Sequence, residues 1–261
     1  MQKIISWNVA SIRARLPALQ KLLMEEAPDV VLLQEIKAEE NSFPFFDLKT
    51  WGYNAVICGQ KSYNGVAILS KDKSQNITSN FGMPEDPLQA RFLQAEVGDL
   101  TFICVYVPNG NSPEKDPQDT TKLTYKLAWM ESLNRHIQSL LDAKRNFVLG
   151  GDFNVIELDS DVYNPEVFRT NALMLPEVRE RYAQLNRLAV TNAIRLKNPE
   201  PHTYSFWDFQ MAAWPRNKGM LLDALFVNNE LKNHIKDAGI LKQVRGWEKT
   251  SDHAPIYLIL D

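Results

Sequence analysis

Short apolar runs alternate along this chain with longer stretches in which apolar residues recur at helical spacing. The short runs have the length and the β-branched and aromatic content of strands. They predict strands over residues 3–9, 30–34, 54–57, 65–70, 92–97, 101–107, 147–150, 222–227 and 256–260. The helical spacing predicts helices over residues 16–26 and 123–143, both with one apolar face packed on a sheet, and residues 177–188 form a further helical run.

The connections between these elements indicate how the strands pair. Most of the early strands are separated by turns or irregular segments, which favours hairpins in a mixed or largely antiparallel sheet over a Rossmann-type parallel sheet. The first strand ends in SWNV and a later one in GDFNV, so each presents an asparagine at its carboxyl end. This faint echo suggests two similar layers that lie face to face.

Two polar segments that contain proline, residues 110–121 and 157–176, interrupt the pattern and predict loops. Apolar strands continue on both sides of each segment, so neither is interpreted as an interdomain linker. With 261 residues, of which 44% are apolar, the chain can bury a sizeable core. We therefore expect residues 1–261 to form a single domain.

Charge and cysteine content exclude several classes of protein. The chain has 29 Lys and Arg against 32 Asp and Glu, and its net charge of −3 excludes a polybasic nucleic-acid coat and a disordered acidic tail. A local basic cleft would still be enough to contact phosphates. Cys58 and Cys104 each lie in an apolar run and are interpreted as buried reduced thiols, so a disulfide scaffold or a zinc knuckle is excluded.

The start of the chain bears on its location. Residues 4–8 are already strand-like, with no charged leader before them, and no apolar run reaches the roughly eighteen residues that a membrane span needs. We expect a soluble cytoplasmic protein with no membrane partner.

Polar side chains gather where the predicted strands end, which is where sheet proteins place catalytic groups. Each also has a structural interpretation: Glu35 as the first charge after a buried strand, Asp152 as part of an Asx turn, and His253 as a structural histidine. Asp223 is harder to explain in this way, because a carboxylate inside an apolar strand needs a strong partner. The candidates are Asn8, Glu35, Tyr106, Asn109, Asp152, Asn154, Asp223, Asp252 and His253.

Together these side chains suggest a metal-dependent hydrolase. The hard oxygen ligands come without cysteine or a paired histidine, which favours Mg²⁺ or Mn²⁺ over zinc. Such a site with one histidine suits hydrolysis of phosphate esters. No P-loop, HExxH or GxSxG motif is present, so NTPases, metallopeptidases and serine hydrolases lack their motifs here.

The strings IISWNVASIRARL, VVLLQEIKAEE, YNGVAILSK, VYVPNG, GGDFNV, YSFWDFQ, GMLLDALFV and TSDHAP follow one another between residues 3 and 260. In this order they resemble the exonuclease III and AP endonuclease branch of the endonuclease/exonuclease/phosphatase superfamily. GDFN and SDH are shared with sphingomyelinases and inositol-polyphosphate phosphatases, whereas LQEIK, YxFWD and VPNG narrow the resemblance to the DNA-repair branch.

The resemblance implies a four-layer α/β sandwich, in which two mixed β-sheets pack face to face with helices outside. It also implies roles for particular residues. Glu35 resembles the principal metal ligand, Asp152 the carboxylate that orients water, and His253 the histidine at the scissile phosphate, oriented by Asp223. By resemblance, the catalytic residues are Tyr106, Asp152, Asn154, Asp223 and His253, the metal contacts Asn8, Glu35, Asp152, Asn154, Asp252 and His253, and the substrate contacts Asn109, Phe206, Met220 and Leu222.

Four positions depart from the family pattern. Ala10 stands where asparagine or aspartate is usual, and Asn192 where aspartate is usual. Leu221 and Ala224 replace an arginine and a histidine or tyrosine around Asp223. These departures suggest a diverged paralogue with weaker metal affinity or a weaker grip on DNA.

The resemblance implies a Mg²⁺-dependent phosphodiesterase, with Mn²⁺ able to substitute, that acts as a monomer on double-stranded DNA. Its expected substrates are abasic sites and blocked 3′ ends, with 3′→5′ exonuclease activity. Met220 and Leu221 predict a looser sugar pocket, and hence abasic-site cleavage that dominates less over 3′-end processing than in specialised AP endonucleases. The alternatives are a phosphatase acting on lipid or inositol phosphates and a DNA-binding paralogue with little turnover.

Overall fold

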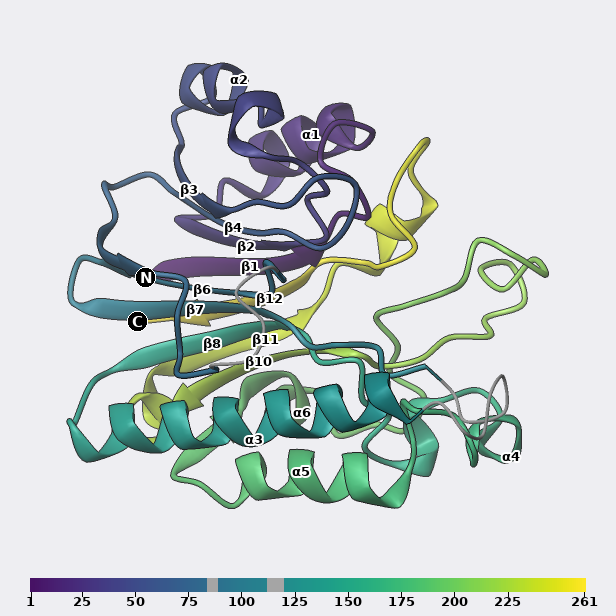
Figure 1. Cartoon of the computed structure of the whole chain (residues 1–261). Coiled ribbons are helices and arrows are strands. Elements are labelled where there is room, and N and C mark those ends of the chain that lie inside the picture. The colour runs from purple at the N-terminus through teal and green to yellow at the C-terminus, as the bar shows by residue number, and fades with distance from the viewer. Residues whose placement is uncertain (84–88, 112–119) are drawn as a thin grey trace.

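The computed structural model describes residues 1–83, 89–111 and 120–261. The described residues form two six-stranded mixed sheets that pack face to face between layers of helices (Figure 1). This is the four-layer sandwich implied by the motifs. In the described part of the chain, no helix is long and apolar enough to cross a membrane.

The first sheet has the order β11-β12-β1-β2-β4-β3. Its central strands β1 and β2 run parallel, and the neighbouring pairs in the sheet are antiparallel. The strands are β1 (Gln2–Asn8), β2 (Val30–Gln34), β3 (Asn54–Cys58), β4 (Val66–Ser70), β11 (Ile235–Ile240) and β12 (Ile256–Leu260).

The second sheet has the order β5-β6-β7-β8-β10-β9 and repeats this plan, with β7 and β8 as its parallel pair. The strands are β5 (Gln75–Thr78), β6 (Phe92–Val97), β7 (Leu100–Tyr106), β8 (Phe147–Asp152), β9 (Val190–Asn192) and β10 (Asp223–Asn228). The echo between SWNV and GDFNV therefore corresponds to one central strand in each of two layers.

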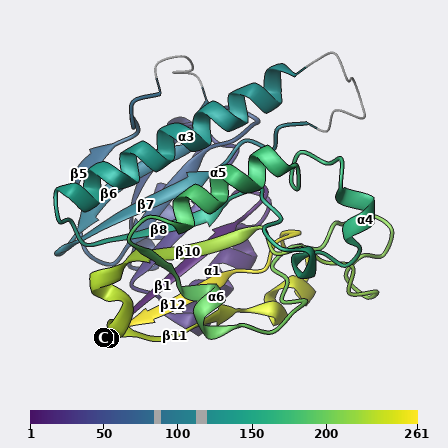
Figure 2. The same ribbon diagram turned by 90° about the horizontal axis from the view of Figure 1, so that it is seen from below.

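Helices cover the outer face of each sheet, as Figures 1 and 2 show. The first sheet is covered by α1 (Leu16–Glu26) and α2 (Phe45–Thr50), and the second by α3 (Thr121–Asp142) and α5 (Pro176–Asn186). Two short helices, α4 (Pro165–Phe168) and α6 (Ala193–Lys197), lie in the segments that connect these elements.

Alternation along the strands builds the three apolar layers of this sandwich. In β1, Ile4 packs between the sheets while Ile5 packs beneath α1. In β7, Phe102 faces the first sheet and Ile103 faces α3. Because successive side chains of a strand point to opposite faces, strands buried on both faces read as continuous apolar runs.

The structure confirms the predicted strands and helices to within about two residues at each end, which is the ordinary uncertainty of element ends. Three strands were not predicted: β5, β9 and β11. All three lie at sheet edges, where one side of a strand has no partner. β5 is polar, β9 has three residues, and β11 has the polar pair Lys236 and Asp237 in its middle, so none reads as a continuous apolar run. Of the predicted loop 110–121, only residues 110, 111, 120 and 121 are described. The other, 157–176, holds a 3₁₀ turn and α4.

Candidate active site

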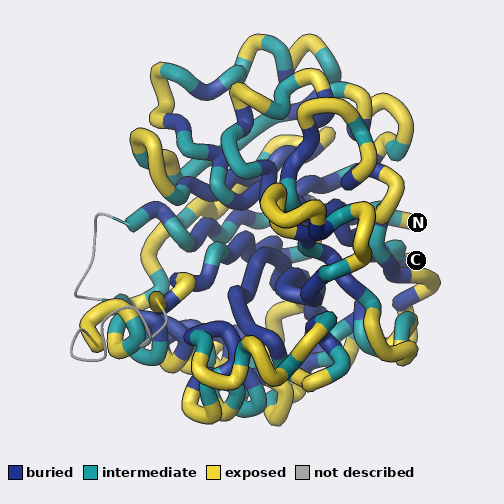
Figure 3. The backbone as a smooth tube through the Cα atoms, turned by 90° about the vertical axis from the view of Figure 1, so that its right-hand side faces the viewer, coloured by how far each residue is buried: buried dark blue, intermediate teal, exposed yellow. Residues whose placement is uncertain are grey.

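The polar residues of the motifs converge because five strands, β1, β2, β8, β10 and β12, begin or end at one end of the sandwich. β1 and β2 are parallel, so Asn8 and the residue after β2, Glu35, lie at the same edge of the first sheet. β12 is antiparallel to β1, so His253, which precedes β12, lies at that edge too. Figure 3 views the molecule from that side and shows buried segments at the centre, ringed by exposed loops.

The second sheet meets this edge in the same way. β8 ends at Asp152, and the antiparallel strand β10 begins directly opposite it at Asp223. A cavity of about 420 Å³ lies over the two edges. It is lined by Glu35, Tyr106, Asn109, Asn111, Asp152, Asn154, Phe168, Asn171, Leu173, Phe206, Asp208, Met220, Leu222, Asp252 and His253.

Glu35 lies at the rim of the cavity and is surrounded by donors. Its carboxylate accepts hydrogen bonds from Asn8 Nδ2 (3.0 Å) and Tyr106 Oη (2.9 Å), and it pairs with Lys37 Nζ at 2.8 Å. Burial acts to raise the pKa of Glu35, but these donors outweigh it and hold the pKa below its usual range. Glu35 is therefore an ionised, partly exposed carboxylate.

The carboxylate oxygens of Glu35 suit a hard divalent cation. Among the described residues, no three His, Cys, Asp or Glu side chains lie close enough together to hold an ion between them. A magnesium ion does not require such a cluster, because it keeps several of its waters and binds through one or two carboxylates. Glu35, an ionised carboxylate at the rim of the cavity, fits this mode of binding. Asn8 directs its amide nitrogen at Glu35, and its Oδ1 accepts from the N–H of Ala10 at 3.0 Å, so a contact between Asn8 and a metal stays a prediction.

A second, fully buried group consists of Asp152, His253 and Asp223. His253 Nδ1 lies 2.8 Å from Asp223 Oδ2, and His253 Nε2 lies 3.6 Å from Asp152 Oδ2. Asp223 also accepts a 2.6 Å hydrogen bond from the hydroxyl of Ser205. The buried carboxylate inside β10 thus has the strong partner that its position requires.

Charges and burial give His253 and Asp152 different protonation states. Burial disfavours a charged imidazole, but the negative charges of Asp223 and Asp152 outweigh it and raise the pKa of His253 to about 10. Burial raises the pKa of Asp152 to about 7, although the positive charge of His253 acts to lower it. His253 is therefore a cation at neutral pH, and Asp152 exchanges its proton near neutrality.

The asparagines link the two halves of the site. Asn8 Nδ2 donates to Glu35 and also, at 3.0 Å, to Asp152 Oδ2. Asn154 donates its backbone N–H to Asp152 Oδ1 at 2.9 Å, and its amide Nδ2 donates to the Val107 carbonyl at 2.9 Å. Asn109 Nδ2 lies 3.4 Å from Asn154 Oδ1 at the cavity surface.

Asp252 is half-buried and faces the cavity beside His253. Its carboxylate accepts a 3.2 Å hydrogen bond from Ser251, whose hydroxyl also donates to the Asn8 carbonyl at 2.6 Å. Its own carbonyl accepts from the backbone N–H of Trp207 at 2.9 Å. The structure brings this residue to the site, and its suggested contact with a metal stays a prediction.

The predicted sugar pocket forms one wall of the cavity. Phe206 pairs with both Met220 and His253 through backbone bridges, and its ring centroid lies 4.9 Å from that of His253. Met220 and Leu222 pack with Leu173 in one apolar cluster. The wall therefore includes Leu173, and also Phe168, which sequence reasoning missed because their segment has no periodic pattern.

The structure shows where the departures from the family pattern fall. Ala10 lies beside Asn8 with a positive φ of 46° and brings no side-chain ligand to the site. Asn192 caps α6, with its Oδ1 accepting from the N–H of Arg195 at 3.2 Å. Leu221 and Ala224 are buried apolar neighbours of Asp223. None of the four displaces a predicted site residue.

Two further polar contacts at the site were missed. Ser205, which is completely buried, lies in the YSFWD motif, and Lys37 is the last residue of LQEIK. Their place inside LQEIK and YxFWD, two of the three motifs that distinguish the DNA-repair branch, was the available signal.

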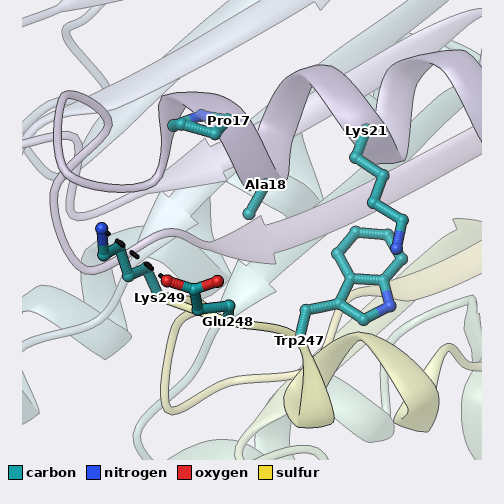
Figure 4. A pocket seen from close by; sticks show the side chains of 6 residues that line it. All are labelled: Pro17, Ala18, Lys21, Trp247, Glu248 and Lys249. Atoms are coloured by element: carbon teal, nitrogen blue, oxygen red, sulfur yellow. Dashed lines mark ion pairs between the residues drawn. The ribbon is translucent and has the colours of Figure 1, made fainter.

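A second hollow, of about 340 Å³, lies between α1 and the segment before Ser251 (Figure 4). Its walls are Pro17, Ala18, Lys21, Trp247, Glu248 and Lys249, and Lys21 Nζ lies 4.2 Å from the centre of the Trp247 ring. It shares no residue with the cavity over the strand ends. We assign no part of the chemistry to it.

The model of the Endonuclease/Exonuclease/phosphatase family matches residues 5–253, which include both halves of the site and all the strands except β12 and the start of β1. The chain belongs to the endonuclease/exonuclease/phosphatase family. Members related to exonuclease III and the AP endonucleases are generally dependent on divalent metals, in keeping with the ionised carboxylate of Glu35.

Individual members of the family are similar over the whole chain. Exodeoxyribonuclease III of Haemophilus influenzae is 31% identical over 98% of each chain. The structure of the 3′ phosphatase NExo from Neisseria bound to a product DNA hairpin is 33% identical, with a TM-score of 0.94 over 100% of both chains. An AP endonuclease from Archaeoglobus fulgidus is 32% identical, with a TM-score of 0.92 over 100% of both chains. The chain is thus a hydrolytic nuclease of the exonuclease III and AP endonuclease branch.

Proposed function

We propose that this nuclease is a Mg²⁺-dependent phosphodiesterase that repairs DNA by cutting at abasic sites and clearing blocked 3′ ends. The observation that carries the proposal is that Glu35 and the Asp152–His253 pair line one cavity, where Asn8 Nδ2 donates to both carboxylates. A phosphodiester bound in this cavity would meet the His253 cation and a metal-binding carboxylate.

The buried group supplies the proton chemistry. Asp152 accepts a proton from the attacking water, and its pKa of about 7 suits a general base near neutral pH. His253 stays protonated and stabilises the negative phosphoryl oxygens, while Asp223 holds its ring in position. Asn154 donates a hydrogen bond to a remaining oxygen, and the hydroxyl of Tyr106, which donates to Glu35, lies beside the phosphate.

The rim of the cavity would supply the ligands for the metal ion. Glu35 and Asn8 would hold a hydrated Mg²⁺, and Mn²⁺ can take the same oxygen ligands. Bound there, the ion lowers the cost of negative charge on the phosphate and the leaving oxygen. Tyr106 is kept protonated for its role as a donor, because burial and the charges of Glu35 and Asp152 raise its pKa far above the usual range.

The apolar wall favours substrates without a base. Phe206, Met220 and Leu222 offer contact area and no polar group that could read a nucleobase, so a bare deoxyribose fits and a normal nucleotide gains little. The two substrate classes are also found among the relatives, one a 3′ phosphatase and one an AP endonuclease. Asn109 would contact the DNA backbone beside the pocket.

A substrate panel tests the proposal. The protein is incubated with Mg²⁺ and matched duplexes that carry an abasic analogue, a 3′-phosphate or a recessed 3′ end. Metal-dependent product that EDTA abolishes and that Asp152→Asn loses is expected on at least one duplex. Absence of product on all three overturns the proposal.

The same panel separates the two alternatives. DNA affinity without product under Mg²⁺ or Mn²⁺ would indicate a binding paralogue. Release of phosphate from inositol phosphates, with none from DNA, would indicate a phosphatase. We further propose that the protein is monomeric and cytoplasmic. The free thiols of Cys58 and Cys104 suit a reducing compartment, and sedimentation and cell fractionation test the two points.

A further inference from the structure

Lys126, in the second turn of α3, has a completely buried side chain. Burying a lysine is costly, and an apolar residue would fit the core-facing side of this helix without that cost. Trp129, Met130 and Leu133 follow on the same face and are all buried apolar residues. A buried charge at this position therefore calls for an explanation other than packing.

The ammonium group of Lys126 is fully satisfied by backbone carbonyls. Its Nζ donates to the carbonyls of Asn154 (2.6 Å), Ala172 (2.9 Å) and Asn109 (3.1 Å). An ammonium has three donors, so all of them are used. Burial lowers the pKa of Lys126 to about 7, whereas the charge of Asp152 and the three carbonyl dipoles favour its protonated form.

The three carbonyls belong to three segments that build the cavity. Asn109 follows β7, Asn154 follows β8, and Ala172 lies between the cavity-lining residues Asn171 and Leu173. The three are far apart in the sequence, and Lys126 is a single point at which they are joined. The distance between the amides of Asn109 and Asn154 therefore depends on this side chain.

Gly110 is matched to Lys126. Its φ of +95° is one that side chains rarely adopt, and a Cβ there would lie 2.8 Å from Lys126 Cδ and 3.2 Å from Ala172 Cβ. The glycine of VPNG thus leaves room for the lysine stem to pass between the two segments.

We propose that Lys126 is a positioning residue that sets the active-site geometry through the backbones of Asn109, Asn154 and Ala172. It touches no reacting group itself. The inference rests on the proposed function to the extent that Asn109 and Asn154 are taken to contact the substrate phosphate.

The test compares Lys126→Met with Met130→Ala. Lys126→Met keeps the length of the stem and removes the three donors. Met130→Ala removes packing from the same helix, one turn further on, and leaves the carbonyls alone. Because small misplacements of catalytic groups are costly, Lys126→Met should lower kcat on a 3′-phosphate duplex by about 10- to 100-fold. Met130→Ala should change kcat less than about twofold at temperatures below its melting point, whatever its loss of Tm.

A second readout does not depend on activity. The side-chain amide signals of Asn109 and Asn154 in ¹⁵N–¹H spectra should shift in Lys126→Met and stay in place in Met130→Ala. If Lys126→Met does not fold, Gly110→Ala takes its place, since it presses on the same stem without removing the charge, and it should shift the same signals.

The outcomes are distinct. Wild-type protein that is inactive on every DNA substrate overturns the proposed function, and the amide signals still decide the role of Lys126. Active wild type with unchanged kcat and unchanged amide signals in the Lys126 or Gly110 variant overturns the positioning role. Equal loss of kcat in Lys126→Met and Met130→Ala assigns Lys126 to the stability of α3 alone and also overturns it.

Discussion

The two central carboxylates of the site, Glu35 and Asp152, carry the same functional group but differ in their sheet, their exposure and the direction of their pKa shift. Glu35 follows a strand of the first sheet, keeps 19% of its side chain exposed, and has a lowered pKa because Asn8, Lys37 and Tyr106 donate to it. Asp152 ends a strand of the second sheet, is 2% exposed, and has a raised pKa because it is buried.

This difference assigns two functions to one type of side chain. A permanently ionised carboxylate at the rim can attract a cation, whereas a buried one with a pKa near neutrality can accept and release a proton. The sheets contribute the two environments separately, and Asn8, which donates to both carboxylates, joins them. The buried carboxylate, the rim carboxylate and the pocket wall can therefore be perturbed one at a time by substitution.

The largest effect is expected from Asp152→Asn, which removes the proton acceptor and keeps the shape. Turnover should fall by about 10² to 10⁴, the range for a positioned general base. DNA binding should stay the same or tighten, because a negative charge facing phosphate is lost. Single-turnover rates and a DNA titration check this. Loss of DNA affinity would instead make Asp152 a structural residue.

Asp223→Asn should have the next largest effect, through His253. Without the negative partner, the pKa of His253 falls from about 10, and turnover should drop by about 10- to 100-fold as the ring loses its orientation. In the wild type the His253 ring should not titrate in NMR spectra between pH 6 and 9, and in the variant it should. The raised pKa stabilises the fold fully below about pH 6.5, and this contribution is lost as pH rises through about 10.

The double variant of Asp223→Asn with His253→Ala tests the pairing itself. Residues that act as a unit give losses that do not add, so the double variant should be little worse than His253→Ala alone. Additive losses would show that the two side chains act independently.

Glu35→Gln perturbs the rim. The Mg²⁺ concentration for half-maximal activity should rise by about tenfold or more, because the anchoring charge is lost while the size is kept. Mn²⁺ binding measured by electron paramagnetic resonance checks the same point without turnover. The pKa of His253 should not move. An unchanged metal titration would remove Glu35 from the metal site.

Met220→Trp alters the pocket wall without touching either carboxylate. A rigid aromatic should narrow the sugar pocket and shift the ratio of abasic-site cleavage to 3′-phosphate release by about two- to tenfold towards abasic-site cleavage. Rates on matched duplexes for wild type and variant decide it. If the ratio is unchanged, the residues that select substrate lie elsewhere in the cavity.

Ala10→Asn is expected to give the smallest effect. It restores an amide beside Asn8, and should lower the Mg²⁺ requirement by about two- to fivefold. Calorimetric Mg²⁺ titration, with Ala10→Val as a control for size, measures it. Equal requirements in all three proteins would show that this departure has no effect on metal affinity.

The structure brings the predicted residues together, and the sequence could indicate them because they follow apolar strands, whose ends are visible as a change from apolar to polar. Asn8, Glu35 and Asp152 all have this signal, and the isolation of Asp223 in an apolar run predicted its buried partner. Their convergence needed the order of strands in two sheets, which local pattern does not contain. The motif resemblance implied two mixed sheets packed face to face, and the order of their strands came from the structure.

Lys126 shows why other features could not be predicted. On an amphipathic helix a lysine is ordinarily taken as part of the solvated face, and its burial depends on carbonyls from segments far away in the sequence. Its spacing from Trp129, Met130 and Leu133 was the one local sign of its orientation.

That residues 1–261 form one domain stays a prediction.

The position of β12 between β11 and β1 has a consequence for synthesis of the protein. β1 pairs with β12 over Gln2↔Leu260, so β1 leaves the ribosome long before β12, the partner that its sheet needs in order to close. His253 emerges only just before β12. A nascent chain can therefore fold local hairpins early, but it carries no complete nuclease site until His253 and β12 have been translated.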